Sequence, residues 1–161
     1  MIVACHTTMA HAALSVPVSA RVIGFLQPVP KGTIAATIIY EPGNAASEAE
    51  AGAIEAAVGG GLAVGGGTLR VRRVAANALA RLAGAQVAFV TTGVRDQQQV
   101  GDAAARAGIL TITSDIGCVR AAHCVVAVSS APRTQITVSR AAARAANIRF
   151  GSAFLMLVKE I

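Results

Sequence analysis

Short apolar runs alternate with longer amphipathic segments along most of the chain. The run TIAATIIY at 33–40 is rich in β-branched residues and is closed by the turn-forming residues EPGN, so it predicts a buried strand. In the next segment, SEAEAGAIEAAV at 47–58, Ser47 and Glu50 have the spacing of a capping box. Three apolar residues of this segment share one helical face. The pattern therefore predicts a strand followed by a helix capped at Ser47.

The same alternation continues through the middle of the chain. The segments that follow are a strand at 69–74, a short helix at 77–84, a strand at 86–92, a helix at 95–108 and a strand at 109–113. Strands that alternate with helices form β-α-β crossovers, which place parallel strands in one sheet with helices on both faces. We therefore predict an α/β fold with a mainly parallel sheet built from β-α-β units and flanked by helices.

The last third departs from this alternation. Two strand-like runs at 123–139 surround a Ser-Ser-Ala-Pro turn, which predicts a C-terminal antiparallel hairpin. A helix at 139–147 follows, and the final segment at 152–161 carries an apolar stripe. The stripe consists of Phe154, Leu157, Val158 and Ile161. We expect these residues to lie on a closing helix that packs on the core, rather than on an exposed partner-binding helix.

Two glycine clusters, at 59–61 and 65–67, raise the question of a phosphate-binding loop. Such loops follow a strand and precede a helix, whereas these glycines follow a predicted helix and precede a predicted strand. We interpret them as a helix stop and a surface loop.

Composition restricts the classes of function. The 161 residues suffice for one domain with a core, and they include four Phe, one Tyr and no Trp. Aromatic platforms for stacking on bases are therefore missing, which argues against nucleic acid as a partner despite the formal net charge of +6. The densest basic group lies at 70–73 in a predicted strand, where a solvated edge is expected. No stretch after the N-terminus reaches the roughly 18 apolar residues of a transmembrane span.

The first residues have the features of an export signal. Residues 10–12 read Ala-His-Ala, the form that signal peptidase recognises, so we predict that 1–12 are the remnant of a secretory signal peptide, cleaved before Ala13. The alternative is a lipobox that ends at Cys5 and would make that residue a lipidated N-terminus. Both interpretations place the protein in the periplasm, with residues 13–161 forming a single α/β domain.

Reactive side chains gather in one short segment, DIGCVRAAHC at 115–124. Once the signal is removed, His123 is the only histidine, and the segment holds both internal cysteines. A zinc site would lack a distant fourth ligand, so we expect no metal. A nucleophile at Cys118 with His123 as base and Asp115 as orienting group can be drawn, but export favours oxidation of the thiol.

A disulfide between Cys118 and Cys124 is the third interpretation of this segment. Export, an even number of cysteines after processing and their proximity favour it. Six residues of continuous helix span roughly 9 Å, which is too far for the Cα atoms of a disulfide. Residues 117–123 are therefore expected to fold back as a compact loop.

Two of the predicted strands, 86–92 and 109–113, are each followed by a loop. We expect both loops at the carboxyl edge of the sheet. Ligands bind at this edge in open α/β sheets. The candidate rim of a small-ligand or partner site consists of Thr92, Gly93, Ser114 and Asp115. The competing interpretation is that these residues only cap helices and turn the chain. We expect neither catalytic residues nor a cofactor.

From residue 109 to the C-terminus the chain resembles the YfiR-like (YfiR/HmsC) periplasmic proteins. The shared plan is a strand ending in a T-x-S-D-like turn, a short loop, a hairpin, a helix of the type SRAAARAANI and a closing S-x-x-L-x-L helix. Weaker similarity extends back to about Val16. Cys118 and Cys124 fall where members of this family tend to carry a disulfide.

The resemblance implies a non-enzymatic regulator that binds and represses a membrane-anchored diguanylate cyclase, and so controls cyclic di-GMP and biofilm formation. A membrane-anchored signalling protein is then the expected partner, and assembly as a homodimer is part of the same hypothesis. Two alternatives from other classes remain, namely a periplasmic small-solute-binding protein and a thiol enzyme that uses Cys118.

Overall fold

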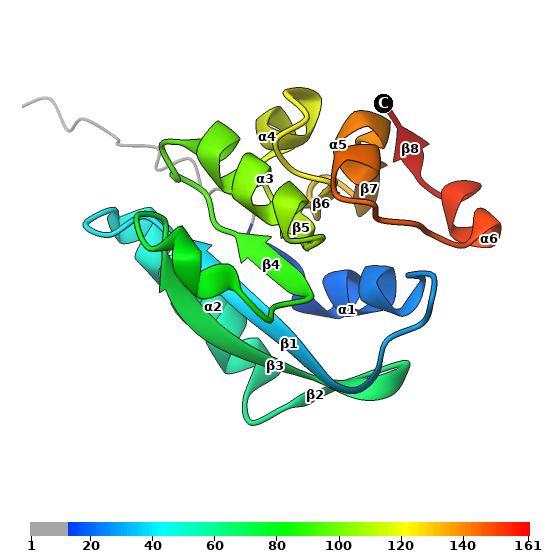
Figure 1. Cartoon of the computed structure of the whole chain (residues 1–161), viewed down its shortest axis with the longest axis horizontal. Coiled ribbons are helices and arrows are strands. Elements are labelled where there is room, and N and C mark those ends of the chain that lie inside the picture. Colours follow the sequence, from blue (N-terminus) through cyan, green and yellow to red (C-terminus); the bar gives the residue numbers. More distant parts are fainter. Residues whose placement is uncertain (1–12) are drawn as a thin grey trace, which may run out of the picture.

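One sheet with the strand order β2-β3-β1-β4-β5-β6-β7-β8 organises the computed structural model, which describes residues 13–161 (Figure 1). The strands are β1 (Lys31–Tyr40), β2 (Leu62–Val64), β3 (Gly66–Ala75), β4 (Val87–Val90), β5 (Leu110–Thr113), β6 (Val126–Ser129), β7 (Gln135–Val138) and β8 (Lys159–Glu160). The helices are α1 (Val16–Gly24), α2 (Ala45–Val58), α3 (Gln97–Arg106), α4 (Ile116–Arg120), α5 (Arg140–Ala145) and α6 (Ser152–Leu155), with a 3-10 helix η1 (Leu79–Leu82).

Most neighbouring strands are parallel, and the exceptions lie toward the two ends of the sheet. The strands β3, β1, β4, β5 and β6 pair in parallel, while β2 runs antiparallel to β3 and β7 runs antiparallel to β6. The predicted mainly parallel α/β sheet and the predicted hairpin are therefore confirmed.

The chain reverses its direction of progress across the sheet at β1. From β1 it passes through α2 and β2 to β3 on one side, and then returns through η1 to β4 on the other side. The carboxyl ends of β1 and β4 consequently lie side by side, with Ile39 paired to Val90. In open α/β sheets such a point is where ligands bind, outside the ends of the strands.

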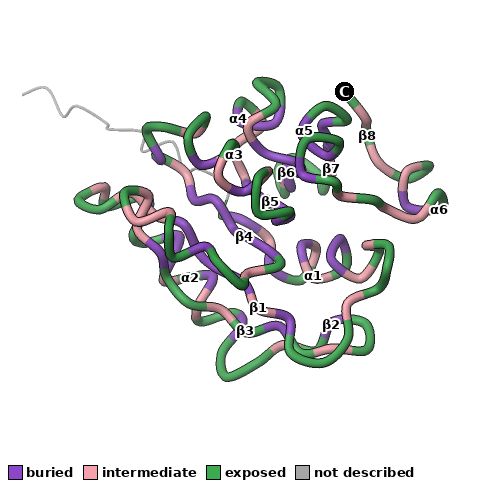
Figure 2. Tube along the Cα trace, in the orientation of Figure 1, coloured by how far each residue is buried: buried purple, intermediate pink, exposed green. Residues whose placement is uncertain are grey.

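Successive residues of the central strands point to opposite faces of the sheet. On β1, Ile38 packs with residues of α1 and α2, whereas Ile39 packs in a second cluster with residues of α3 and α4. Phe89 and Val90 of β4 divide between the same two clusters. Burial of each such side chain contributes roughly 1.5–3 kcal/mol. Figure 2 shows the result, since the central strands are largely buried while the helices expose their outer turns.

The start of α2 differs from the prediction. The N-cap is Asn44, whose Oδ1 accepts a hydrogen bond of 3.0 Å from the backbone N–H of Ser47, so the capping box at Ser47 and Glu50 is wrong. Asn44 ends the turn after β1, and asparagine is among the strongest capping residues. Because the helix begins three residues earlier than expected, Ser47 and Glu50 lie within it and are buried.

The predicted closing helix at 152–161 is also wrong. The helix α6 has four residues, after which the chain extends and forms β8 beside β7. Of the predicted apolar stripe, Phe154 is buried, whereas the side chain of Leu157 is 79% exposed. The N–H of Ile161 donates to the carbonyl oxygen of Val138 over 2.9 Å. Pairing with the open edge of β7 therefore replaces the last turns of the helix.

Smaller differences concern the segment at 77–84 and the glycine clusters. The predicted short helix is reduced to the 3-10 turn of η1. Gly59 ends α2 as predicted, but the second cluster forms the tight turn between β2 and β3 and the start of β3 rather than a surface loop. A Cβ atom at Gly67 would lie 2.7 Å from the carbonyl oxygen of Gly32, so the two strands can approach only because glycine stands there.

The predicted signal remnant, residues 1–12, lies outside the described residues. In the part that the structure describes, no helix has the length and apolarity needed to cross a membrane.

Candidate functional site

Polar side chains gather where the three neighbouring strands β1, β4 and β5 end. Glu41 directly follows β1, Thr91 and Thr92 follow β4, and Ser114 follows β5. The first turns of α2 contact the same strand ends through their buried face. The site therefore lies at the carboxyl edge of the sheet, at the point where the chain changes direction.

Glu50 connects two of these strand ends. Its Oε2 accepts a hydrogen bond of 2.7 Å from the backbone N–H of Thr92, and its Oε1 accepts one of 2.9 Å from the hydroxyl of Ser114. The residue is only 7% exposed, and burial of a carboxylate is costly unless its oxygens are hydrogen-bonded. Glu50 thereby ties α2 to the ends of β4 and β5.

Ser47 forms a second connection, toward β1 and β4. Its Oγ accepts a hydrogen bond of 2.8 Å from the N–H of Glu41 and lies 2.6 Å from Oγ1 of Thr91. Since the hydroxyl of Thr91 donates to the carbonyl oxygen of Ile39 over 2.9 Å, the proton between the two hydroxyls belongs to Ser47. The hydroxyls of Ser47 and Thr91 thus each donate one hydrogen bond and accept one.

The loop between β4 and α3 is held against the end of β1 and the start of α2. Oε2 of Glu41 accepts a hydrogen bond of 3.1 Å from the N–H of Arg95. Gly93 has a φ of +81°, and a Cβ atom there would lie 2.6 Å from Nδ2 of Asn44. The positive φ therefore favours glycine at this position, and a larger residue would also have to displace the amide of Asn44.

Asp115 has two partners within the protein. Its Oδ1 accepts a hydrogen bond of 2.8 Å from the N–H of Gly117 and caps α4, while its Oδ2 accepts one of 2.7 Å from the side-chain amide of Gln97. The N–H of Asp115 itself donates to the hydroxyl of Thr113 over 3.0 Å. The carboxylate thus joins the start of α4 to the start of α3.

The structure places all four predicted rim residues, Thr92, Gly93, Ser114 and Asp115, at the carboxyl edge. The backbone of Thr92 and the side chains of Ser114 and Asp115 are engaged in the hydrogen bonds described above. Thr92 itself is half-buried, and its hydroxyl, by contrast, has no hydrogen-bond partner among residues 13–161. Most of the polar groups at this edge therefore brace the fold, and few are left for a ligand.

Sequence reasoning missed the two residues of α2 that organise the edge, Ser47 and Glu50. The signal that could have found them is Asn44, which follows a Pro-Gly turn and lies three residues before Ser47. With Asn44 as N-cap, Ser47, Glu50 and Ile54 fall on one helical face. An acidic residue on that buried face indicates a buried hydrogen-bonded carboxylate.

Cys118 and Cys124 form a disulfide, with their Cα atoms 5.2 Å apart. The helix α4 ends at Arg120, and Ala122 adopts a φ of +59°, which turns the chain back. The N–H groups of His123 and Cys124 both donate to the carbonyl oxygen of Cys118. The compact loop expected at 117–123 is present, and the Cys118 sulfur is buried and bonded, so it offers no free thiol here.

His123 contributes its backbone rather than its ring to this loop. The described residues give the ring no hydrogen-bond partner, and the side chain is half-buried. Among residues 13–161, no group of three His, Cys, Asp or Glu side chains is arranged to hold a metal ion.

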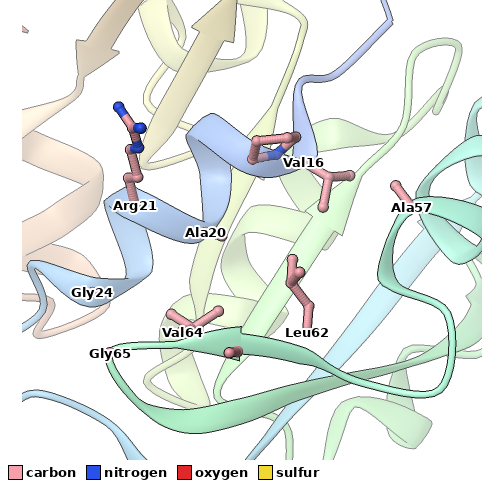
Figure 3. A pocket seen from close by; sticks show the side chains of 10 residues that line it. Val16, Ala20, Arg21, Gly24, Ala57, Leu62, Val64 and Gly65 are labelled. Carbon is pink, nitrogen blue, oxygen red and sulfur yellow. The ribbon is translucent and has the colours of Figure 1, made fainter.

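An apolar groove of about 340 Å³ lies between α1 and β2, away from the carboxyl edge (Figure 3). Val16 of α1 and Leu62 and Val64 of β2 line it, and Arg21 is the only charged residue of its wall. Figure 3 shows the Arg21 side chain extending away from β2, so the groove offers apolar contact without a charged anchor.

Solved structures share this fold at low sequence identity. A ligand-free, open substrate-binding protein with adhesive properties from Clostridium difficile is 13% identical, with a TM-score of 0.69 over 93% of this chain and 60% of that chain. A conserved domain protein from Vibrio cholerae is 13% identical, with a TM-score of 0.64 over 90% and 58% of the two chains. An ABC domain in complex with L-Trp from Streptococcus pneumoniae is 11% identical, with a TM-score of 0.60 over 86% and 57%.

The chain therefore spans less than two thirds of the length of each of these structures, and the likeness concerns the fold. Among curated proteins, no sequence matches it significantly. The family model described as YfiR/HmsC-like matches residues 43–159, which include β2 to β7, the first residue of β8 and both cysteines of the disulfide. The chain belongs to the YfiR/HmsC-like family.

Proposed function

We propose that this protein is a periplasmic regulator that binds a membrane-anchored diguanylate cyclase and represses its synthesis of cyclic di-GMP. The observation that carries the proposal is the YfiR/HmsC-like match over residues 43–159, since this is a family of periplasmic regulators. Regulation by protein contact requires a folded surface but no reacting groups.

The geometry of the polar edge supports a role without chemistry. The buried carboxylate of Glu50 is engaged at both oxygens, and Asp115 is likewise engaged by Gln97 and Gly117. A general base must lie within reach of a substrate proton, and neither carboxylate is free to take that role without breaking these hydrogen bonds. Cys118 is held in the disulfide, which removes the nucleophile of the thiol-enzyme alternative.

The test is a reconstitution with the cyclase from the same host. The affinity-tagged protein, exported by that host, is used to capture a protein with a GGDEF domain from detergent-solubilised membranes. Cyclic di-GMP formation from GTP by the solubilised cyclase is then measured with and without added protein. We expect capture of the cyclase and at least a tenfold fall in its rate; a folded protein that captures no cyclase, or captures it without changing the rate, would contradict the proposal.

A second candidate function is the binding of a small periplasmic solute at the carboxyl edge. The likeness of the fold to a substrate-binding protein and to a domain in complex with L-Trp favours it, as does the position of the polar residues at the switch point of the sheet. The free hydroxyl of Thr92 would be a polar contact for such a solute.

Thermal unfolding in the presence of amino acids, with L-Trp as the first probe, tests this candidate. A ligand at 100 times its Kd stabilises by about 2.7 kcal/mol, which raises the Tm of a domain of this size by roughly 5–10 °C. Thr92→Val should reduce that shift, whereas Thr134→Val, an exposed threonine of the β6–β7 loop, should leave it unchanged. No shift with any amino acid would exclude this class of ligand.

A further inference from the structure

A pocket of about 310 Å³ lies at the opposite end of the sheet from β2, beside the C-terminal strand β8. Three arginines line it, Arg140 and Arg144 of α5 and Arg149 of the following loop, together with the single carboxylate of Glu160. Figure 1 shows α6 and β8 next to α5 in this region. We name this surface the arginine pocket, and it differs from the groove beside α1 in having a strongly basic wall.

The charge of the arginine pocket is not compensated within the described chain. Elsewhere, Arg73 pairs with Glu55, and Arg95 lies 3.8 Å from Glu41. In contrast, the guanidinium groups of Arg140, Arg144 and Arg149 have no hydrogen bond or ion pair among residues 13–161. The three cations outnumber the carboxylates of Glu160 and of the last residue, Ile161, whose oxygen accepts a hydrogen bond of 2.9 Å from the backbone N–H of Arg140. The local potential is therefore positive, which attracts a partner of negative charge.

The rest of the pocket is apolar. Ile148 and Phe150 are half-buried and form part of its floor. Leu155 also lines the pocket and is followed in the chain by the exposed residues Met156 and Leu157. Met156 is 86% exposed. A free anion would gain little from this floor, because burial of apolar area stabilises only ligands that are themselves partly apolar.

The spacing of the arginines favours an extended peptide. Arg140 and Arg144 are four residues apart on one helix, so their side chains are neighbours with Cβ atoms about 5–6 Å apart. Alternate side chains of an extended chain lie roughly 6.5–7 Å apart on one face, since each residue rises about 3.3 Å. In addition, β8 is the last strand of the sheet, so its outer edge offers backbone groups to an added strand.

We propose that the arginine pocket binds an extended segment of a protein partner in which acidic residues alternate with apolar ones. This inference rests on the proposed function, because it assigns the segment to the periplasmic part of the membrane-anchored cyclase. The acidic side chains pair with Arg140 and Arg144, and the apolar side chains contact the floor at Ile148 and Phe150.

The decisive experiment compares charge reversals inside and outside the pocket. Arg140→Glu/Arg144→Glu is the test variant, and Arg120→Glu/Arg133→Glu is its control, with the same change in net charge at exposed residues that do not line the pocket. Thermal unfolding checks that both variants fold. Capture of the cyclase from solubilised membranes should fall at least tenfold for the test variant and less than twofold for the control.

The conservative variant Arg140→Lys/Arg144→Lys keeps the charge and should retain most of the capture. Capture by the wild type should also weaken as salt rises, because an exposed charge pair is screened by salt. If the wild type captures the cyclase and the test variant captures it equally well, the inference about the pocket fails while the proposed function stands. If the wild type captures no cyclase, the proposed function and this inference fail together.

A photo-crosslinker identifies what occupies the pocket. The reactive residue p-benzoylphenylalanine replaces the exposed Met156, and the adducts formed in membranes are sequenced by mass spectrometry. We expect a periplasmic segment of the cyclase that contains alternating acidic residues. An adduct with a second copy of this chain, or with a segment that lacks Asp and Glu, would overturn the proposal. Loss of the adduct in millimolar citrate or glutamate at constant ionic strength would also overturn it, because it would indicate a site for small anions.

Discussion

The carboxylate of Glu50 accepts a hydrogen bond of 2.9 Å from the hydroxyl of Ser114, although the two residues are 64 positions apart in the chain. The contact joins α2, which follows β1, to the end of β5. Glu50 also accepts a hydrogen bond from the N–H of Thr92, so this one buried side chain holds the ends of β4 and β5 in place relative to α2. Hydrogen bonds to a charged group are stronger than those between neutral groups, so this connection is expected to dominate the stability of the carboxyl edge.

Replacing Glu50 should therefore destabilise the protein in a graded way. Glu50→Ala leaves two buried donors without a partner and should lower the free energy of unfolding by about 3 kcal/mol. Glu50→Gln should cost only about 1 kcal/mol, because its carbonyl oxygen can accept from Thr92 while its amide donates to the oxygen of Ser114. Urea denaturation measures both values.

Glu55 provides the matched control on the same helix. Its ion pair with Arg73 is exposed to solvent, so Glu55→Gln should change the free energy of unfolding by no more than about 0.5 kcal/mol. A double-mutant cycle of Glu50→Ala with Ser114→Ala should give a coupling of about 1 kcal/mol. Additive effects of these two substitutions would show that the hydrogen bond contributes nothing of its own.

Gly101 of α3 packs against the backbone of the disulfide loop. A Cβ atom at this position would lie closer to the carbonyl oxygen of His123 than van der Waals contact allows. Gly101→Ala should thus lower the free energy of unfolding by about 2 kcal/mol, since either the helix or the loop must move. This is the opposite of the usual effect in a helix, where alanine is more favourable than glycine by about 1 kcal/mol.

Gly52 of α2 supplies the comparison for that substitution. A Cβ atom there meets only the end of the Arg73 side chain, at an ordinary distance of 3.5 Å. Gly52→Ala should raise the free energy of unfolding by about 0.5–1 kcal/mol. If both alanine variants were more stable than the wild type, the close packing of α3 on the loop at His123 would be wrong.

The sheet could be predicted from the sequence because its central strands are buried on both faces. A strand such as β4, with the sequence VAFV, then appears as a continuous apolar run that needs no alternation to be recognised. The residues at the carboxyl edge could be predicted from the order of strands and helices alone, because the carboxyl ends of parallel strands all lie at the same edge of the sheet. This is why Thr92, Gly93, Ser114 and Asp115 could be grouped from the sequence alone.

What could not be predicted depends on competition between local and distant partners. Ser47 and Glu50 have the spacing of a capping box, but Asn44 caps the helix and releases both side chains to bind strand ends far along the chain. At the C-terminus, the apolar spacing of Phe154 and Leu157 is typical of a helix. The open edge of β7 offers a distant backbone partner instead, and no local pattern reveals this.

Two residues of that predicted stripe distinguish the observed C-terminus from a closing helix. Phe154 is buried and stacks on Phe25, with ring centroids 5.0 Å apart, so Phe154→Ala should lower the free energy of unfolding by about 3–4 kcal/mol. Leu157 is mostly exposed, so Leu157→Ala should change it by less than about 0.5 kcal/mol. Comparable losses at both positions, measured by urea denaturation, would support the closing helix and contradict β8.

A buried hydroxyl on β1 gives a substitution that should stabilise the protein. Thr37 is fully buried, and its Oγ1 has no hydrogen-bond partner among the described residues. Thr37→Val replaces the hydroxyl with a methyl group of similar shape and should raise the free energy of unfolding by about 1 kcal/mol. Thr91→Val is the control and should destabilise by at least as much, because the hydroxyl of Thr91 joins Ser47 to Ile39.

Removal of the disulfide should cost little stability, because the loop that it closes is short. In the chain-entropy model, a bridge across the six-residue separation of Cys118 and Cys124 stabilises by about 2 kcal/mol. Cys118→Ala/Cys124→Ala should therefore lower the free energy of unfolding by about this amount and make it insensitive to reductant. The bond itself is detected by digestion with trypsin, which cleaves after Arg120, between the two cysteines. Without reductant the two resulting peptides should remain linked, and their separation would show that the thiols are free in the exported protein.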